Sequence, residues 1–457
     1  MTTPHAIAAD LWGLGGMPAD ALGQLSLRGE EPALPSSFRV DAAAQASIGV
    51  AGLAAAEIHR ARGGGAQGVS VDMRHAATEF RSEHWLSVAD TPVRSLWDPI
   101  AGTYCTGDGG WVRLHTNFPH HRDGILALLG CGADKAEVAR ALLDWQAEAF
   151  ETAATARGMC VAAMRSFAQW DGHPHAASVA EVPLLITRIG DAPPTPLPPA
   201  GARPLSGLRV LDLTRVIAGP VAGRTLAAHG ADVLHITGPG VPNLPGLIVD
   251  TGRGKRAAEV DLRTPEGVAC LRQLVSGADV FLQSYRQGAL AARGFAPDEV
   301  AALRPGIVVA DLSAYGAQGP WGGKRGFDSL VQTATGFNHA EAAAAGSNGP
   351  KPLPCQALDH ASGYLLAFGT QAALLRRARE GGSWKVTVSL VATARWLRGL
   401  GRLPGGLAAP EPTREDVADF LEVTGAVTAA RHAALLAETP AFWSAPAALL
   451  GSSAPVW

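Results

Sequence analysis

Between residues 208 and 312, short apolar segments alternate with helical ones, and this alternation restricts the possible folds more than any other feature. The apolar segments 208–213, 231–236, 279–282 and 306–312 have the length of buried strands. The intervening stretches 221–229, 265–277 and 297–303 have helical patterns. A strand, a helix and a second strand form a βαβ unit, which builds a parallel sheet. We therefore predict an α/β fold with helices on both faces of the sheet.

A proline-rich segment at residues 191–204 separates this region from the first 190 residues. It has six prolines in 14 residues, so it can form neither a regular helix nor a central strand. The 457 residues are enough for about three domain-sized units. We therefore expect this segment to be a linker between separately packed parts of the chain.

Composition and charge disfavour several classes of protein. Hydrophobic residues make up 47% and charged residues 17% of the chain, so it can bury a large core. The 38 basic and 41 acidic residues almost balance, which disfavours nucleic acid or an anionic membrane as a partner. The five cysteines are scattered and include no CxxC pair, which argues against a disulfide scaffold or a zinc site. With neither a signal peptide nor a membrane-spanning segment evident, we expect a cytoplasmic protein.

The loops that follow the predicted strands are candidate ligand contacts, because open parallel sheets bind ligands at the carboxyl ends of their strands. Residues 214–220 follow the first strand but lack both the GxGxxG and the P-loop patterns. Residues 315–328 form a long loop whose glycines would allow a close approach to a ligand. Residues 253–256 include three basic side chains, which could hold phosphates or lie in a solvated loop.

Asp359 directly precedes an apolar helix, and two interpretations of its carboxylate remain open. It could cap the helix, or it could act as a covalent nucleophile. A similar pattern begins at Asp41: each aspartate is followed by a helical stretch, an Arg-Ala-Arg element and a Val-x-Val element, at offsets of 317 to 318 residues. This similarity indicates either a duplication or a chance likeness of alanine-rich helices.

Four segments together resemble the family III CoA-transferases, also called the CaiB/BaiF family: 205–220, 230–236, 255–267, and 314–320 with 326–328. The resemblance covers about residues 205–395, and Asp359 lies where this family has its nucleophilic aspartate. Residues 108–114 and 167–175 resemble parts of the family's second half. The chain is therefore similar to a circularly permuted member with a partly duplicated overlap at residues 38–90.

The resemblance implies a CoA-transferase family III fold, in which a Rossmann-like parallel sheet is joined by a smaller α+β domain. It also implies a division of the chain into five parts. Residues 1–95 are an overlap segment that resembles the region after the catalytic aspartate, and residues 96–190 are a small domain with its return helix. The linker at 191–204 follows. Residues 205–400 are a Rossmann-like CoA-binding and catalytic domain, and residues 401–457 are a C-terminal extension.

By the same resemblance, the chain would move CoA between an acyl-CoA thioester and a carboxylic acid through an aspartyl anhydride and an aspartyl-CoA at Asp359. Coenzyme A is then a substrate, and neither a tightly bound cofactor nor a metal is expected. A homodimer is expected. The contacts to CoA carried over by position are Ile217, Ala218, Val260, Asp261, Leu262, Arg263, Ser284, Tyr285, Arg286, Arg325, Gly326, Phe327 and Asp328.

Two alternatives remain open. A racemase or isomerase of the same fold needs two acid/base groups, and racemases of this family typically have Gly-His-Asp where this chain has residues 326–328. Phe327 cannot transfer a proton, which counts against that function. A non-catalytic CoA-binding protein is the second alternative, because Thr237–Gly238 and Ser284–Tyr285 depart from the family pattern.

Overall fold

The computed structural model describes residues 2–93 and 97–457, and its largest element is a seven-stranded sheet. The strand order is β11-β10-β9-β12-β13-β14-β8, and only the β14–β8 pair is antiparallel. The strands are β8 (Leu184–Gly190), β9 (Arg209–Leu213), β10 (Asp232–Thr237), β11 (Lys255–Glu259), β12 (Val280–Gln283), β13 (Val308–Ser313) and β14 (Ser383–Ser389). The four predicted strands begin and end within two residues of β9, β10, β12 and β13, which confirms the α/β fold.

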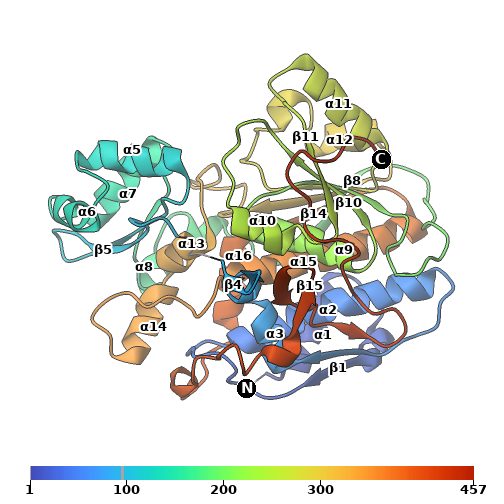
Figure 1. The fold of residues 1–457 in the computed structure, drawn as a ribbon, viewed down its shortest axis with the longest axis horizontal. Helices are drawn as coiled ribbons and strands as arrows, with labels where there is room; N and C mark the ends of the chain where they lie inside the picture. The colour runs from blue at the N-terminus through green and yellow to red at the C-terminus, as the bar shows by residue number, and fades with distance from the viewer. Residues whose placement is uncertain (1, 94–96) are drawn as a thin grey trace.

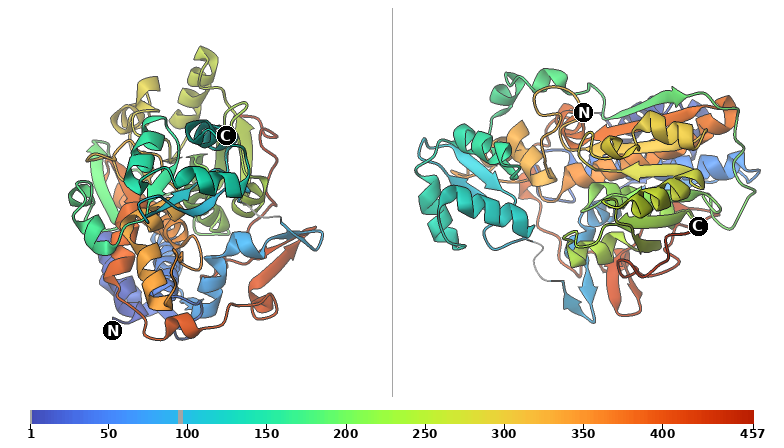
Figure 2. Two further views of the ribbon diagram at one scale, coloured as in Figure 1. Left: turned by 90° about the vertical axis from the view of Figure 1, so that its left-hand side faces the viewer. Right: turned by 90° about the horizontal axis from the view of Figure 1, so that it is seen from above.

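Helices cover both faces of this sheet (Figures 1 and 2). In β9, Val210 packs with α9 and α15, whereas Leu211 packs with α11 and α12, because successive side chains of a strand point to opposite faces. The helix α11 begins as predicted, with Pro265 at its first position and the Thr264 hydroxyl accepting the N–H of Gly267. The helices of this region are α9 (Ala218–Ala228), α10 (Pro245–Thr251), α11 (Pro265–Ser276), α12 (Pro297–Leu303), α13 (Asp328–Thr335), α14 (Phe337–Ala345), α15 (Ala357–Glu380) and α16 (Leu390–Gly399).

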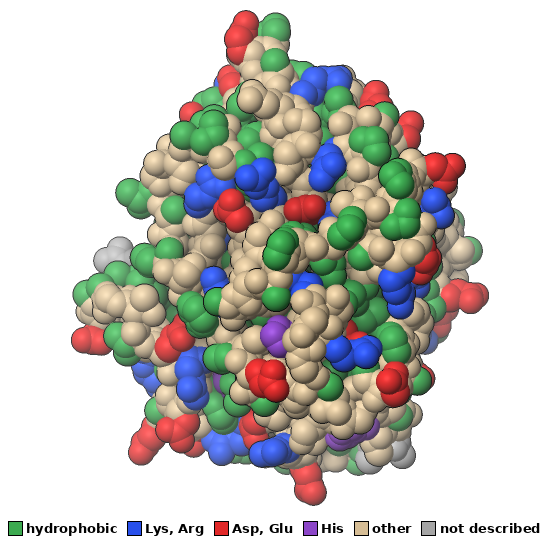
Figure 3. All heavy atoms as spheres, turned by 90° about the vertical axis from the view of Figure 1, so that its right-hand side faces the viewer, with side chains coloured by type: hydrophobic (Ala, Val, Ile, Leu, Met, Phe, Trp, Pro, Cys, Tyr) green, Lys and Arg blue, Asp and Glu red, His purple; other side chains and the backbone are tan. Residues whose placement is uncertain are grey.

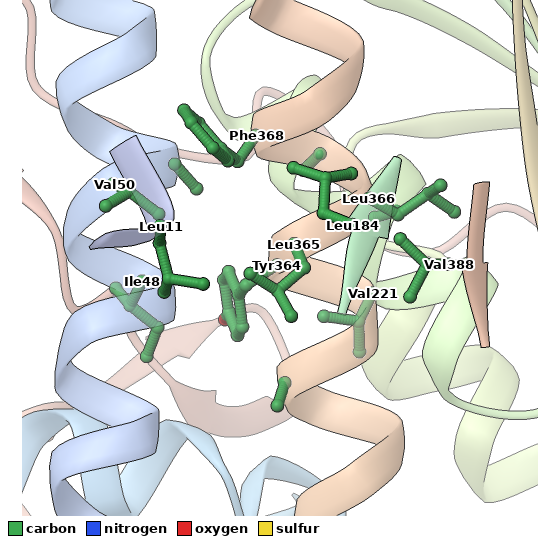
Figure 4. Close-up of a cluster of buried hydrophobic side chains, with 14 of the residues drawn as sticks. Leu11, Ile48, Val50, Leu184, Val221, Tyr364, Leu365, Leu366, Phe368 and Val388 are labelled. Carbon is green, nitrogen blue, oxygen red and sulfur yellow. The ribbon is translucent and has the colours of Figure 1, made fainter. Parts of the chain in front are cut away.

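The N-terminal part of the chain packs against this domain through one long helix, α2 (Val40–Ala61). It lies along α15, and Figure 4 shows side chains of both helices, among them Ile48, Val50, Leu365 and Phe368, in one buried cluster. Because α2 has many alanines, the two helices bury their facing surfaces almost completely. The other elements of this layer are α1 (Pro4–Leu14), β1 (Leu25–Arg28), β2 (Val69–Asp72), α3 (Met73–Glu79), α4 (Ser82–Trp85) and β17 (Leu435–Leu436).

The similar stretches that begin at Asp41 and Asp359 have the same order of elements. Each aspartate lies in the first turn of a long helix, α2 or α15. A strand follows each helix, β2 or β14, and then a further helix, α3 or α16. Shared element order adds to the sequence similarity and supports a duplication over a chance likeness.

Residues 102–163 form the small α+β domain with its own hydrophobic core. An antiparallel sheet in the order β5-β6-β7 is covered by three helices. This domain projects to the left of the main sheet in Figure 1 and at the left of the right-hand view of Figure 2. Its elements are β5 (Gly102–Cys105), β6 (Trp111–Leu114), α5 (Pro119–Leu129), α6 (Lys135–Leu142), α7 (Ala147–Ala156) and β7 (Val161–Ala163), and α8 (Phe167–Asp171) follows it.

The C-terminal residues run back over the large domain. The N–H of Ser453 donates to Ala257 O beside the edge strand β11, and the Trp457 indole donates to Leu274 O in α11. Another small sheet, β15-β16-β3-β4, joins this segment to the N-terminal part: β3 (Ser87–Val88), β4 (Thr91–Pro92), β15 (Leu421–Thr424) and β16 (Val427–Ala430). Short 3₁₀ helices occur at Ala19–Gln24, Ala176–Ser178, Ala291–Arg293, Gly406–Ala408 and Ala418–Phe420.

Residues 191–204 form neither a helix nor a strand. The boundary predicted between residues 95 and 96 falls outside the described residues. On the face in Figure 3, basic and acidic side chains are interspersed rather than gathered by sign. Among the described residues, we find no helix with both the length and the apolar character needed to cross a bilayer.

Candidate active site

A cavity of about 560 Å³ opens at the carboxyl ends of the sheet strands, where the small domain meets the large one. The loops after β9, β10, β11, β12 and β13 line it together with the start of α15 and parts of the small domain. Its volume is in the range of small-molecule sites. Its place follows from the topology, because all these loops leave parallel strands at the same edge.

Most of the residues predicted from the sequence line this cavity. Asp359 does, and so do Ile217, Ala218, Val260, Asp261, Leu262, Arg263, Ser284, Tyr285, Arg286, Arg325, Gly326 and Phe327. Asp328 is not in the cavity wall and is fully buried, which is at odds with the predicted direct contact to CoA.

The first turn of α9 and the second turn of α15 approach each other closely beside the cavity. A Cβ atom on Gly363 would lie 2.6 Å from the carbonyl oxygen of Ala218, so only glycine allows this approach. The loop before α9 contains Val216 at a φ of 76°, a conformation that a β-branched residue rarely adopts. Such strain costs about 1–3 kcal/mol and commonly marks functional sites.

The Asp359 carboxylate lies in the cavity wall, and the residue is only 7% exposed. Among the described residues, we find no hydrogen bond to its carboxylate oxygens. Burial raises the pKa of Asp359 well above its usual value, and the nearby carboxylates of Asp328 and Glu83 raise it further. The N-terminal end of the 24-residue α15 opposes this effect, because its dipole favours a negative charge in the first turn.

Asp328 holds the start of α15 from behind the cavity wall. Its Oδ2 accepts the N–H of Leu358 at 2.7 Å and that of Asp359 at 2.9 Å, and its Oδ1 accepts the side-chain amide of Gln332. Burial raises the pKa of Asp328 to about 7 despite these hydrogen bonds. Asp328 therefore fixes the backbone of Asp359 and adds a second acidic group beside it.

Behind Asp359, the helix is joined to the N-terminal part of the chain. The buried His360 imidazole lies 3.0 Å from a carboxylate oxygen of Glu83, and its ring stacks on Phe80. Glu83 is in α4, so a residue far upstream influences the charge at the candidate nucleophile.

Two basic positions expected as phosphate contacts do not line the cavity. Lys255 and Arg256 are in β11 rather than in a loop. Lys255 is buried, 2.8 Å from Asp212, and Arg256 pairs with Asp232. Each pairs across the sheet because β11 continues the parallel order beside β10. The described residues also contain no cluster of three or more metal-ligating side chains.

Sequence reasoning missed the side of the cavity that the small domain provides. Phe118, His120, His121 and Cys160 line it, and the rings of His115 and Phe327 stack at 3.7 Å across the seam between the domains. These residues are far in sequence from the loops that they face: Phe118 is 97 positions before Arg215, and no local pattern marks them. The one signal in the sequence was the group of three histidines at positions 115, 120 and 121.

A buried ion cluster joins the glycine-rich loop to the small domain. Lys324 lies 2.7 Å from Glu151, which is also 2.6 Å from Arg165. All three side chains are at most 5% exposed. The two cations lower the pKa of Glu151 against the opposing effect of burial, so it stays ionised. This cluster fixes the loop that carries Arg325 and Phe327.

Comparison with known proteins gives one family. The sequence profile of CoA-transferase family III matches residues 205–455. The chain is 34% identical over 230 residues to the probable fatty acyl-CoA transferase Rv3272 of Mycobacterium tuberculosis, covering 46% of this chain and 58% of that protein. It is 28% identical over 409 residues to an acyl-CoA transferase of Gibberella moniliformis, covering 79% of this chain and 71% of that protein. A crystal structure of Rv3272 matches with a TM-score of 0.41 at 34% identity, over 44% of this chain and 59% of that one.

The chain spans about half the length of several curated relatives that it matches, between 43% and 58%. The match to the Gibberella protein covers so much of this chain that it includes residues before 205.

Proposed function

This chain belongs to CoA-transferase family III, and from that premise we propose that it transfers CoA from an acyl-CoA thioester to a carboxylic acid. The observation that carries the proposal is the position of Asp359. Its carboxylate is in the wall of a cavity large enough for a substrate, at the N-terminal end of a long helix. Family membership further suggests a homodimer and a cytoplasmic enzyme, and the order of the segments suggests a circular permutation.

The proposed reaction begins with attack of an ionised Asp359 oxygen on the thioester carbonyl carbon. The C–S bond breaks, CoA leaves as a thiolate, and an anhydride joins Asp359 to the acyl group. The thiolate then attacks the Asp359 carbonyl, which releases the acid and leaves an aspartyl-CoA thioester. An acceptor carboxylate reverses both steps, so Asp359 is regenerated and no net proton is consumed.

The surroundings of Asp359 serve this sequence in two ways. Its high pKa makes the ionised form a stronger base and nucleophile, although less of it is present at neutral pH. Ile217 and Ala218, at the start of α9, line the same cavity, and their backbone N–H groups could stabilise an oxyanion. Removing one such donor typically costs about 3 kcal/mol of transition-state stabilisation.

A direct test is isotope exchange between an acyl-CoA and its labelled free acid. Asp359→Asn should reduce exchange to the background rate. Asp41→Asn is a matched control, because Asp41 has the same place in the first turn of α2 but is not in the cavity wall. Exchange that survives in Asp359→Asn would refute the proposal. CoA binding without exchange would favour a binding protein, and uptake of solvent deuterium at the α-carbon would favour a racemase.

A further inference from the structure

The cavity has two separate groups of arginines. Arg263, Arg286 and Arg293 are on the loops after β11 and β12, and the Arg293 guanidinium donates to the carbonyl of Leu262. Arg215 and Arg325 are on the loops after β9 and β13, beside the start of α5 in the small domain. Arg263, Arg286 and Arg325 are already expected contacts to CoA, whereas nothing yet accounts for Arg215.

The second group forms a compact cluster with two histidines. The Cζ atom of Arg215 lies 5.2 Å from the Phe118 ring centroid, and Phe118 packs against His120 and His121 at 6.1 and 6.2 Å. Arg325 donates to the carbonyl of Gly158 at 3.0 Å, so it reaches the small domain from the opposite loop. All of these residues except Gly158 line the same cavity.

Positive charge in this cluster is not balanced by a neighbouring carboxylate. Among the described residues, neither Arg215 nor Arg325 has an acidic partner within salt-bridge distance. Arg215 donates to the carbonyl of Pro242, and its Nε is buried and lacks a hydrogen bond within that part of the chain. Both arginines are half-buried, and a cation partly removed from water is stabilised when an anion pairs with it.

A buried histidine with one unpartnered ring nitrogen among the described groups lines the cavity beside these arginines. His121 is 4% exposed, its Nε2 faces the sulfur of Cys160 at 3.4 Å, and its Nδ1 has no partner among the described groups. Burial and the charges of His120, Arg325 and Arg215 lower the pKa of His121 to about 3. The imidazole is therefore neutral and can donate a hydrogen bond without adding a charge.

We propose that Arg215, Arg325, His120 and His121 form an anion subsite across the seam between the small domain and the large sheet. The subsite takes an anionic oxygen group of the substrate: either a phosphate of CoA or the second carboxylate of a dicarboxylic acyl group. Guanidinium groups bind both through paired N–H donors. Arg215 directly precedes Val216, whose φ of 76° is a strained conformation of the kind that clusters at functional sites.

The subsite is tested by binding rather than turnover, so its failure is distinguishable from failure of CoA transfer. Thermal shift and calorimetry on the full chain would use pyrophosphate, CoA, succinate and butyrate. We expect Arg215→Met and Arg325→Met to weaken binding of at least one anion about tenfold or more. Weaker binding of pyrophosphate and CoA in these variants identifies a phosphate subsite. Loss for succinate, with butyrate unaffected, identifies a carboxylate subsite.

Arg209→Met is the matched control. Arg209 is the first residue of β9, at the end of the strand opposite to the loop that carries Arg215, and it lies near Trp457. Arg215→Lys keeps the charge and should retain part of the affinity, which separates anion binding from misfolding. Unchanged binding of all anions in both methionine variants, or losses no larger than in Arg209→Met, would overturn the proposal. So would a wild-type protein that binds none of these anions.

Discussion

The carboxylate of Asp328 accepts the backbone N–H of Asp359 at 2.9 Å, so two buried acidic side chains meet at the first turn of α15. The contact has two effects. It fixes the backbone of the proposed nucleophile, and it places beside Asp359 a second carboxylate, which adds to the effect of burial in raising the pKa of Asp359. The two protons therefore leave in steps that belong to the pair rather than to either residue.

Removing one charge from this pair should shift the pH dependence of the reaction. Asp359 must be ionised to attack, so activity should rise with pH. In Asp328→Asn, the amide oxygen can still accept the backbone N–H groups, but the negative charge is gone. The pKa of Asp359 should fall, and the acidic limb of kcat/KM should move to lower pH.

The matched control for this shift is Asp311→Asn, because Asp311 is another buried carboxylate, within the strand β13, and does not line the cavity. In Asp311→Asn, the acidic limb of kcat/KM should lie at the same pH as in the wild type. An unchanged limb in Asp328→Asn, or one that moves to higher pH, would show that Asp328 does not set the ionisation of Asp359.

Asp41 should affect stability rather than catalysis. Its Oδ2 accepts the N–H groups of Ala33 and Leu34, at 2.7 and 3.2 Å, and burial raises its pKa to about 7. Because its folded pKa is raised, its contribution to stability is complete below the unfolded value, near 3.8. It is then lost as pH rises to about 7.

Asp41→Asn keeps an acceptor oxygen but cannot ionise, so the variant should gain stability relative to wild type as pH rises. Urea denaturation at pH 5 and pH 8 measures this difference. If the difference in free energy of unfolding between Asp41→Asn and the wild type were the same at both pH values, the raised pKa of Asp41 would be contradicted.

The buried ion cluster at the glycine-rich loop predicts an asymmetric mutational pattern. Glu151→Ala leaves the cations of Lys324 and Arg165 facing each other, and should destabilise the protein by about 3–5 kcal/mol. Lys324→Met leaves the Glu151–Arg165 pair intact and should cost less. Urea denaturation measures the free energy of unfolding of both variants. Equal losses of stability in the two would argue against a Glu151 carboxylate that is shared by both cations.

Much of the large domain could be predicted because its signals are local. The strands β9, β10, β12 and β13 are apolar runs, and Thr264 and Pro265 mark the start of α11 within two residues of sequence. By contrast, the basic residues at 253–256 indicate either phosphate contacts or a solvated loop, whereas Lys255 and Arg256 lie in the strand β11. Its pairing with Asp212 and Asp232 arises only when neighbouring strands align.

The cavity was only half predictable for the same reason. Loops such as 217–218 and 325–327 follow strands, and family resemblance located them. The wall formed by Phe118 and His121 depends on how the small domain packs, which no local spacing encodes. Asp328 was found by resemblance, but its role in holding the Asp359 backbone depends on a contact between residues 31 positions apart.

The most direct test is to trap the covalent intermediate on the protein. Wild type would be incubated with an acyl-CoA and hydroxylamine, digested, and analysed by mass spectrometry, with Asp359→Asn and Asp41→Asn in parallel. We predict a hydroxamate on the peptide that contains Asp359, in wild type and Asp41→Asn only. A hydroxamate at another residue, or measurable exchange with no modification of Asp359, would contradict the proposed nucleophile.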